Sequence, residues 1–292
     1  MQRPIISIII PSFNQGRFIE GTLASVFAQG YPALDVRIYD GGSTDETLEV
    51  LRRHANRIAH WESVPDRGQS HAINKGLAAM RGKIWMYLNS DDWLAPGALQ
   101  AVAEAFADPQ VAWVVGGGEI RNASGTCGSV VPGIPRSDYD VLTPWARPGR
   151  HVFPFSGASF HRAESVPRHG MFDEALHLCM DIEYYTRLHF AGITPQRLER
   201  TLACWRWHDE AKTSTIGADL GFRVEEIQIA TRYAHHLASA ERTRLMGEIR
   251  RWRDWLALRG RTTLAALLSA AIRRPHLLRF RPWWGAVRGT LR

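Results

Sequence analysis

The residues of this chain that are best able to do chemistry are acidic side chains that follow short apolar runs. Residues 83–88, a run that predicts a buried strand, are followed by Asn89, Ser90, Asp91 and Asp92. Two adjacent carboxylates repel one another, so the pair is expected to need a positively charged partner. Asp40 follows a similar run over residues 36–39. Because a lone acid at such a place is more often a helix cap, the other strand ends decide whether these acids form a site.

Four polar clusters follow predicted strands. They are Pro11-Ser12-Phe13-Asn14, Asp40-Gly41-Gly42-Ser43, Pro65-Asp66-Arg67-Gly68-Gln69 and Asn89-Ser90-Asp91-Asp92. Ligands of open α/β sheets bind outside the carboxyl ends of the strands. The four clusters therefore favour one shared binding site. For Asp91 and Asp92, the alternative is that they cap a helix predicted to begin near Pro96.

The elements that must position these clusters alternate between strand and helix patterns. Strands are predicted over residues 5–10, 36–39, 58–61 and 83–88, and helices over residues 15–29, 43–51, 72–80 and 96–106. Ser43 and Glu46 have the spacing of a capping box at the start of the second helix. Such alternation predicts an α/β fold with a parallel, doubly wound sheet.

The pattern loosens in the second half of the chain. Residues 116–150 are rich in Gly, Pro and Ser, which predicts a long loop of the lid or acceptor-loop kind. A strand over 152–160, a helix over 181–190 and a strand over 202–207 follow. The residues beyond this last strand are predicted to be helical.

The polar clusters and the segments around them resemble a known family. SIIIPSFNQGRFIEGTLASVF, IYDGGSTDETLEVL, SVPDRGQSHAINKGLAAMRG and YLNSDD look like parts of a family 2 glycosyltransferase. The resemblance implies a GT-A fold, in which a Rossmann-like, mostly parallel sheet is flanked by helices. It also implies a GT-A domain over 1–215, with a nucleotide-binding half over 1–115 and an acceptor half over 116–215. A helical basic extension would occupy 216–292.

The resemblance implies roles for residues of the polar clusters. Those assigned to the nucleotide are Pro11, Phe13, Asp40, Asp66, Asn89 and Ser90, with Asp40 meeting the nucleobase. Asp91 would be the carboxylate that binds Mn²⁺ or Mg²⁺ together with the pyrophosphate, and Asp92 is a secondary candidate. Asn89 and Gly41 stand where the family commonly has an acid.

Transfer of a sugar also needs a base that takes the proton of the acceptor hydroxyl. Asp181 resembles the family's downstream acidic motif and is assigned this role, with a helix cap as the alternative. Glu183 and Arg187, on the same predicted helix, are secondary candidates. His208 resembles the family's late histidine near the metal, and Lys212 is a secondary candidate for contact with the phosphates.

These assignments predict an inverting, metal-dependent glycosyltransferase that uses a nucleotide-sugar, most simply a UDP-sugar. Its acceptor would be a glycan or a lipid-linked intermediate of surface polysaccharide or glycoconjugate synthesis. The alternatives are a sugar-phosphate nucleotidyltransferase and a non-catalytic nucleotide-sugar-binding or scaffold module. The sequence contains no Gly-x-Gly-x-x-Gly after the first strand and no phosphate-loop motif, which disfavours dinucleotide-binding enzymes and phosphate-loop NTPases.

Charge is unevenly distributed along the 292 residues, whose net charge is +7. From residue 241 onward there are thirteen arginines and three acidic residues, a net charge of +10, whereas residues 1–240 total −3. Tryptophans and leucines lie between these arginines, which predicts a helix at an anionic membrane surface. Packing of this tail on the core is the alternative. No nucleic-acid-binding motif accompanies the charge, so no nucleic acid partner is expected.

Cysteines and apolar runs indicate the expected location. The three cysteines are far apart and form no Cys-x-x-Cys pair, which is typical of a reducing compartment. The apolar run at 5–10 is short for a signal peptide, and no run approaches the roughly 20 residues of a membrane span. The expected location is the cytoplasm, with peripheral attachment at the inner face of the cytoplasmic membrane.

Overall fold

The computed structural model describes residues 3–122, 125–130, 135–146, 153–212 and 218–257. Within them, nine strands form one sheet in the order β3-β2-β1-β4-β8-β6-β9-β5, and β7 pairs with β6. The strands are β1 (Ile6–Ser12), β2 (Leu34–Asp40), β3 (His60–Ser63), β4 (Ile84–Tyr87), β5 (Trp93–Leu94), β6 (Trp113–Asn122), β7 (Gly125–Val130), β8 (Ser159–Arg162) and β9 (Gln196–Arg206).

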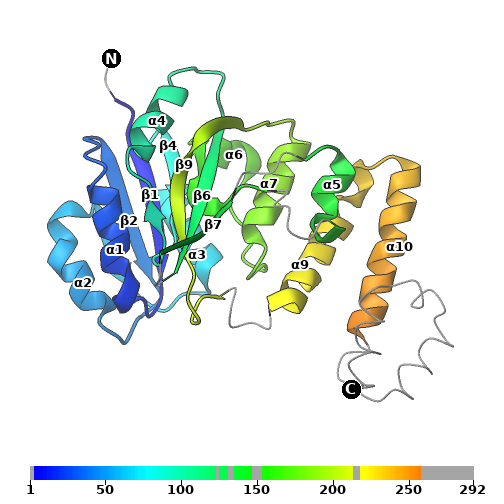
Figure 1. Ribbon diagram of the computed structural model, residues 1–292, viewed down its shortest axis with the longest axis horizontal. Helices are drawn as coiled ribbons and strands as arrows, with labels where there is room; N and C mark the ends of the chain where they lie inside the picture. The colour runs from blue at the N-terminus through cyan, green and yellow to red at the C-terminus, as the bar shows by residue number, and fades with distance from the viewer. Residues whose placement is uncertain (1–2, 123–124, 131–134, 147–152, 213–217, 258–292) are drawn as a thin grey trace.

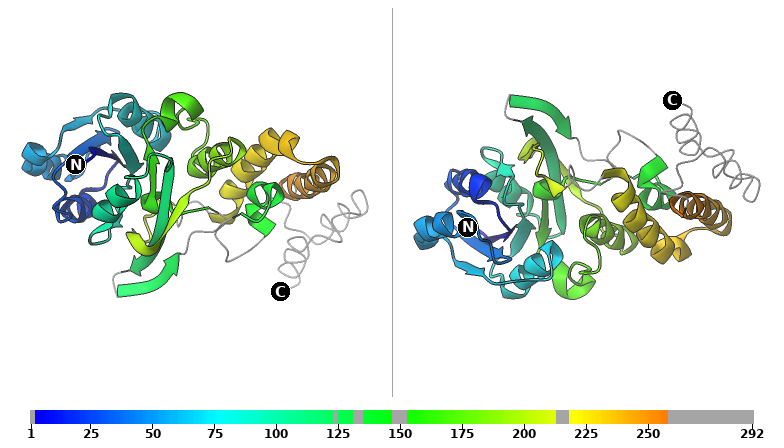
Figure 2. Two further views of the ribbon diagram at one scale, coloured as in Figure 1. Left: turned by 90° about the horizontal axis from the view of Figure 1, so that it is seen from above. Right: turned by 90° about the horizontal axis from the view of Figure 1, so that it is seen from below.

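Helices cover both faces of this sheet, and the last helices extend to one side of it (Figure 1). They are α1 (Gly16–Phe27), α2 (Thr47–His54), α3 (Gln69–Ala79), α4 (Ala98–Ala105), α5 (Asp138–Leu142), α6 (Ser165–His169), α7 (Met180–Phe190), α9 (Ala218–Tyr233) and α10 (Ser239–Leu256). Figure 2 shows that the hairpin of β6 and β7 projects away from the body of the sheet.

The register of the first strands explains why the polar clusters meet. β1 pairs in parallel with β2 and β4, and β2 pairs in parallel with β3. Ser12 lies beside Asp40, and Asp40 lies beside Ser63, so these three strands end at the same edge. The second half is mixed: β8 is antiparallel to β4 and β6, whereas β9 is parallel to β6. The predicted parallel arrangement therefore describes the first half of the sheet.

Three local predictions were wrong. Ser43 does not cap α2, which begins at Thr47, because the Ser43 hydroxyl donates to Asp40 and accepts from the backbone N–H of Asn14. The predicted loop over 116–150 contains the end of β6, all of β7 and α5. Where a strand was predicted up to residue 160, a short 3₁₀ turn leads into β8.

Side chains of β4 alternate between two layers of the core. Met86 and Leu88 pack on the side of α1 and α4, whereas Trp85 and Tyr87 pack on the side of α3 and α7. This alternation is expected of a strand, since successive side chains point to opposite faces. Tyr87, near the end of β4, is therefore directed toward the helix that carries Asp181.

Helices α9 and α10 pack against the helices of the acceptor half. Ile229 of α9 is buried in the cluster that contains the apolar residues of α7. Leu245 and Ile249 of α10 are buried with residues of α5 and α9. The helix that follows the predicted domain boundary at 215 thus belongs to the same core as the helix of Asp181.

The described part of the basic tail packs on the protein. Trp252 and Leu256 of α10 were expected at a membrane surface, but they contact the cluster formed with α5 and α9. Residues 258–292 hold eight of the thirteen tail arginines and lie outside the described residues. Among the helices that the structure describes, none is long and apolar enough to cross a membrane.

Candidate active site

Asp91 and His208 meet where β4 and β9 end. His208 Nε2 lies 3.0 Å from Asp91 Oδ2, although the two residues are 117 positions apart. The His208 ring packs against Phe18 of α1, with ring centroids 4.3 Å apart. Arg206 Nε donates to the carbonyl oxygen of Asp91 at 2.9 Å, and Ser90 beside it is buried. The structure thus brings together the two residues that the family resemblance assigns to a metal.

Asp92 has a structural role that differs from that of Asp91. Its side chain is 1% exposed, its Oδ1 accepts from the backbone N–H of Arg206 at 3.0 Å, and its Oδ2 accepts from Asn89 Nδ2 at 3.1 Å. Burial and the charge of Asp91 raise the pKa of Asp92 well above its usual range. The two carboxyls are therefore neighbours with different partners. Neither caps α4, whose N-cap residue is Gly97, so the capping alternative is wrong.

Asn89 lies within a chain of hydrogen bonds that crosses the site. Besides donating to Asp92, it accepts at Oδ1 from Gln69 Nε2 at 2.8 Å. Gln69 Oε1 in turn accepts from Lys212 Nζ at 3.1 Å, and Lys212 also donates to the carbonyl oxygen of His177. This chain connects the end of β4 with the loop that precedes α7. The neutral amide of Asn89 suits this position because it can donate and accept at once.

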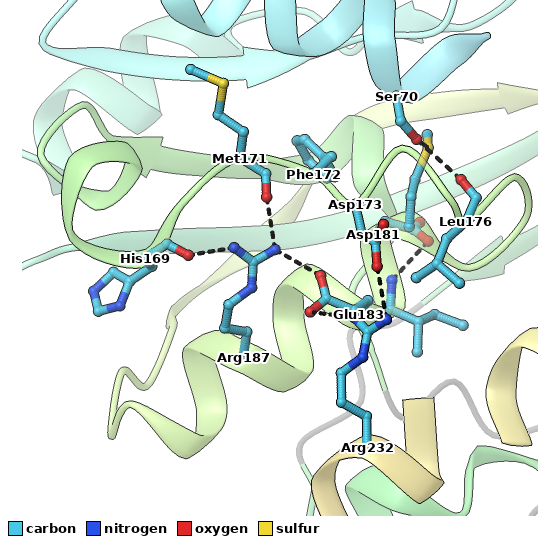
Figure 3. A network of polar contacts seen from close by, with 12 residues as sticks. Ser70, His169, Met171, Phe172, Asp173, Leu176, Asp181, Glu183, Arg187 and Arg232 are labelled. Carbon is cyan, nitrogen blue, oxygen red and sulfur yellow. Dashed lines mark hydrogen bonds and ion pairs between the residues drawn. The ribbon is translucent and has the colours of Figure 1, made fainter. Parts of the chain in front are cut away.

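Asp181 is the second residue of α7 and lies near the start of that helix (Figure 3). Burial raises the pKa of Asp181 to about 6, to which the charge of Glu225 adds, whereas the charge of Lys212 opposes the rise. Burial also raises the pKa of Tyr87, and the charges of Asp181 and Asp92 both add to that rise. The charges of Asp181 and Asp92 thus both act on Tyr87, the last residue of β4.

Glu225 of α9 holds the loop that leads to Asp181. Its buried carboxylate accepts from the backbone N–H groups of residues 177–179, each at 2.8 Å. These groups lie at the N-terminal end of α7, where a negative charge is stabilised by the helix dipole. Glu225 thereby fixes the backbone two residues before Asp181.

Glu183 and Arg187 have packing roles rather than the place in the site that was expected of them. Glu183 is buried and accepts from Arg187 Nη2 at 2.7 Å and from the Tyr233 hydroxyl at 2.6 Å. Arg187 also donates to the carbonyl oxygens of His169 and Met171, which precede α7 (Figure 3). These contacts join α7 to α9 and to the end of α6.

The residues predicted for the nucleobase lie at the ends of β1, β2 and β3. Phe13 is 60% exposed, whereas Pro11 before it is buried. Asp40 is buried at the end of β2. Asp66 follows β3 and accepts at Oδ1 from the backbone N–H of Gly68 at 2.7 Å.

The Asp91–His208 pair fits a divalent cation as part of its ligand set. The two side chains are hydrogen-bonded to one another at 3.0 Å, and a carboxylate oxygen and an imidazole nitrogen are both groups that could bind a divalent cation. Within the described ranges, no group of three or more His, Cys, Asp or Glu side chains could hold a metal. The protein would therefore supply two ligands and leave other positions to phosphate oxygens and water, as is usual for Mg²⁺ at nucleotide sites.

Four residues of this site had no role assigned from the sequence: Gln69, Tyr87, Arg206 and Glu225. Gln69 and Tyr87 lie inside segments that carried the family resemblance, so their neighbours gave a signal. Arg206 lies two residues before His208, which the resemblance singled out. Glu225 lies in a helix without a motif, and its partners are 46 to 48 positions away.

A family model described as Glycosyl transferase family 2 matches residues 7–162, more than half of the chain. The chain belongs to this family. The matched stretch of the glycosyltransferase runs from β1 to β8 and includes all four polar clusters. Asp181 and His208 lie beyond it, so their place in the site depends on the geometry described above.

Relatives and solved structures agree with this assignment. The chondroitin synthase of Escherichia coli is 35% identical over 105 residues, which are 35% of this glycosyltransferase and 15% of that protein. Other curated relatives are matched over about a third of their length.

Two solved structures share the fold of this glycosyltransferase. S. aureus TarS in complex with UDP-GlcNAc has a TM-score of 0.61 at 17% identity, over 85% of this chain and 72% of that chain. The mannosyltransferase of Pyrobaculum calidifontis in complex with GDP-Man and Mn²⁺ has a TM-score of 0.56 at 21% identity, over 100% of this chain and 86% of that chain. At these identities the likeness shows the fold alone, and the predicted GT-A fold is confirmed.

Proposed function

We propose that this glycosyltransferase moves a sugar from a UDP-sugar to a hydroxyl group of a glycan or lipid-linked acceptor, with inversion, in polysaccharide or glycoconjugate synthesis. The observation that carries the proposal is the Asp181 carboxyl near the start of α7, because burial raises its pKa to about 6, a value that suits a base. The chondroitin synthase relative and the UDP-GlcNAc complex of TarS support the choice of reaction and donor.

In the proposed reaction the acceptor oxygen attacks the anomeric carbon while its proton passes to Asp181. The bond between that carbon and the diphosphate oxygen breaks, and UDP leaves with the electron pair. A single displacement of this kind inverts the anomeric configuration. A base is most effective when its pKa lies near the working pH, since it is then deprotonated and still accepts a proton.

Asp91 and His208 would hold Mn²⁺ or Mg²⁺ in this reaction. When bound, the cation would neutralise the charge that develops on the departing diphosphate. Phe18 supports the His208 ring from one face, and Arg206 holds the backbone of Asp91 in place. Lys212 would place a further positive charge beside the phosphates.

The nucleotide would lie along the ends of β1 to β4. The exposed ring of Phe13 offers a stacking surface for a base, and Pro11 and Asp66 complete that end of the site. Asn89 and Ser90 precede the metal ligand and would lie beside the ribose.

A panel of nucleotide-sugars incubated with the protein and Mn²⁺ tests this proposal. Release of UDP from one UDP-sugar, increased by added glycan or lipid-linked acceptors, is the expected result. Pyrophosphate release would instead indicate a sugar-phosphate nucleotidyltransferase. Nucleotide binding without turnover of any donor would indicate a binding module and overturn the proposal.

Replacing Glu225 with Gln should move the acidic limb of the pH–rate profile to lower pH. The Glu225 charge raises the pKa of Asp181, so the neutral side chain should let Asp181 lose its proton at lower pH. Turnover should also fall, because an amide oxygen replaces two carboxylate oxygens that accept three backbone N–H groups. The measurement is kcat between pH 5 and 8, with the exposed Glu241→Gln as control. An unmoved limb in Glu225→Gln would contradict this account.

We further propose that the residues beyond α10 attach the protein to anionic lipid. Truncation after residue 257 should leave UDP affinity unchanged and abolish binding to anionic vesicles. Full-length protein should bind these vesicles less as salt rises, because attraction is screened beyond a Debye length of about 8 Å.

The stability of the fold and the binding of vesicles can be separated by a second truncation. Truncation after residue 240 should lower the melting temperature, because it removes Leu245 and Ile249 from their buried cluster. Full-length protein that ignores anionic vesicles at low salt would show that the tail is not an anchor.

A further inference from the structure

Two carboxyls lie near the ends of β2 and β3. Asp40, the last residue of β2, is buried, whereas Asp66, in the loop after β3, is partly exposed. Asp40 is 1% exposed. Its Oδ2 accepts from the backbone N–H groups of Gly42 at 3.2 Å and Ser43 at 2.8 Å, and from the Ser63 hydroxyl at 2.6 Å. Its Oδ1 accepts from the Ser43 hydroxyl at 2.5 Å.

Asp40 is held by protein groups and is almost inaccessible to a ligand. Three protein donors bond to its Oδ2 and one to its Oδ1, and the residue is 1% exposed. Because these donors come from the loop after β2 and from the end of β3, Asp40 ties neighbouring strand ends together. Its role is to hold the shape of the site.

Asp66 stands in the space that a side chain at position 41 would fill. A Cβ atom built on Gly41 would lie 3.3 Å from Cγ, Oδ1 and Oδ2 of Asp66. The glycine at 41 thus admits a carboxyl that comes from the loop after β3.

The Asp66 carboxyl is also oriented. The backbone N–H of Gly68 donates to Oδ1 at 2.7 Å, whereas Oδ2 has no hydrogen-bond partner among the residues that the structure describes. The residue is only partly buried, so Oδ2 can meet a ligand.

The exposed aromatic ring of the site, that of Phe13, lies just after β1, the strand that pairs with β2. Gly41 donates its backbone N–H to the carbonyl oxygen of Ser12 at 2.9 Å, which continues the pairing of β1 with β2. Phe13 directly follows Ser12 and is 60% exposed. A stacking surface and an oriented carboxylate acceptor are therefore on neighbouring strand ends.

We propose that Asp66, rather than Asp40, selects the nucleobase of the donor by accepting its ring N–H. This inference rests on the proposed function, since it concerns the donor of the same reaction, and it replaces the expectation that Asp40 meets the base. The bases that fit carry a ring N–H beside a carbonyl, as uracil does at N3. Cytosine has an unprotonated N3 with a lone pair, which a carboxylate oxygen repels.

UDP and CDP are the matched probes, because at this edge they differ in whether N3 carries a proton. Wild-type protein should bind UDP at least tenfold more tightly than CDP, which is the usual strength of a hydrogen bond to a charged group. In Asp66→Asn the Gly68 N–H keeps the side-chain oxygen at the Oδ1 position, so the amide nitrogen takes the place of Oδ2. This variant should lose affinity for UDP and gain affinity for CDP, reversing the preference. Asp66→Ala should lose affinity for UDP without gaining affinity for CDP.

Asp40→Asn is the matched control, since it makes the same chemical change at the other carboxyl. It should weaken UDP and CDP binding by equal factors, because it disturbs the loop without touching the base. Calorimetric titration of each variant with both nucleotides gives the ratio, and thermal melting reports folding separately. An unchanged UDP-to-CDP ratio in Asp66→Asn overturns the inference and leaves the proposed function standing. A wild-type protein that binds neither nucleotide overturns both.

Discussion

Asp181→Asn should lower turnover by about 10²–10⁴ while UDP affinity stays nearly unchanged. The substitution keeps the shape of the side chain and removes its ability to take a proton. Asp181 lies at the start of α7, whereas UDP is expected along the ends of β1 to β4, so donor binding should not depend on the carboxylate. Rates with saturating donor and acceptor, together with calorimetric titration of UDP, measure the two effects separately.

The turnover of the wild-type enzyme should depend on pH through the protonation of Asp181. Burial raises the pKa of Asp181 to about 6, and a base works only in its deprotonated form. Turnover should therefore rise with pH up to about 6 and level off above it, and the residual activity of Asp181→Asn should lack this limb. Wild-type turnover in Asp181→Asn would transfer the role to another group and remove the main support for the proposed mechanism.

Wild-type protein should bind UDP more tightly with Mn²⁺ than without it, and Asp91→Ala should abolish this difference. Asp91 Oδ2 and His208 Nε2 are 3.0 Å apart and are the two protein ligands expected for the cation. Loss of the cation from the transition state should cost several kcal/mol, so turnover should fall by orders of magnitude.

Asp209→Ala is the matched control for this experiment. Asp209 is exposed and follows His208 directly, so its removal changes the net charge equally but leaves the Asp91–His208 pair in place. The variant should keep the response to Mn²⁺. Equal UDP affinity with and without Mn²⁺ in the wild-type protein would contradict the assignment of Asp91.

The strand ends of the site could be predicted because their pattern is local. Residues 6–10 are buried on both faces of the sheet, and such strands appear in sequence as continuous β-branched runs. The polar residues that follow them must lie at the sheet edge whatever the rest of the chain does. The position of the polar clusters at the sheet edge therefore followed from the sequence.

Which hydrogen-bond partner each side chain of the site has depends on tertiary contacts. The family resemblance separated Asp91 from Asp92, but the sequence did not predict the contacts that Asp92 accepts from the backbone N–H of Arg206 and from Asn89 Nδ2. The sequence around Ser43 fits a capping box, but in the structure the Ser43 hydroxyl donates to the carboxylate of Asp40 and does not cap α2. Such choices are made by partners that are distant in sequence.

The attachment of Glu225 to residues 177–179 has a consequence for how the enzyme is made. The ribosome completes every family motif before it adds α9, so a nascent chain that ends near residue 215 already has its strand-end clusters and Asp181. The backbone before Asp181 gains its carboxylate acceptor only when α9 has emerged and docked. Maturation of catalysis should therefore lag behind maturation of donor binding during synthesis. For the same reason, a chimaera that exchanges the acceptor half between relatives must include α9 in the grafted segment.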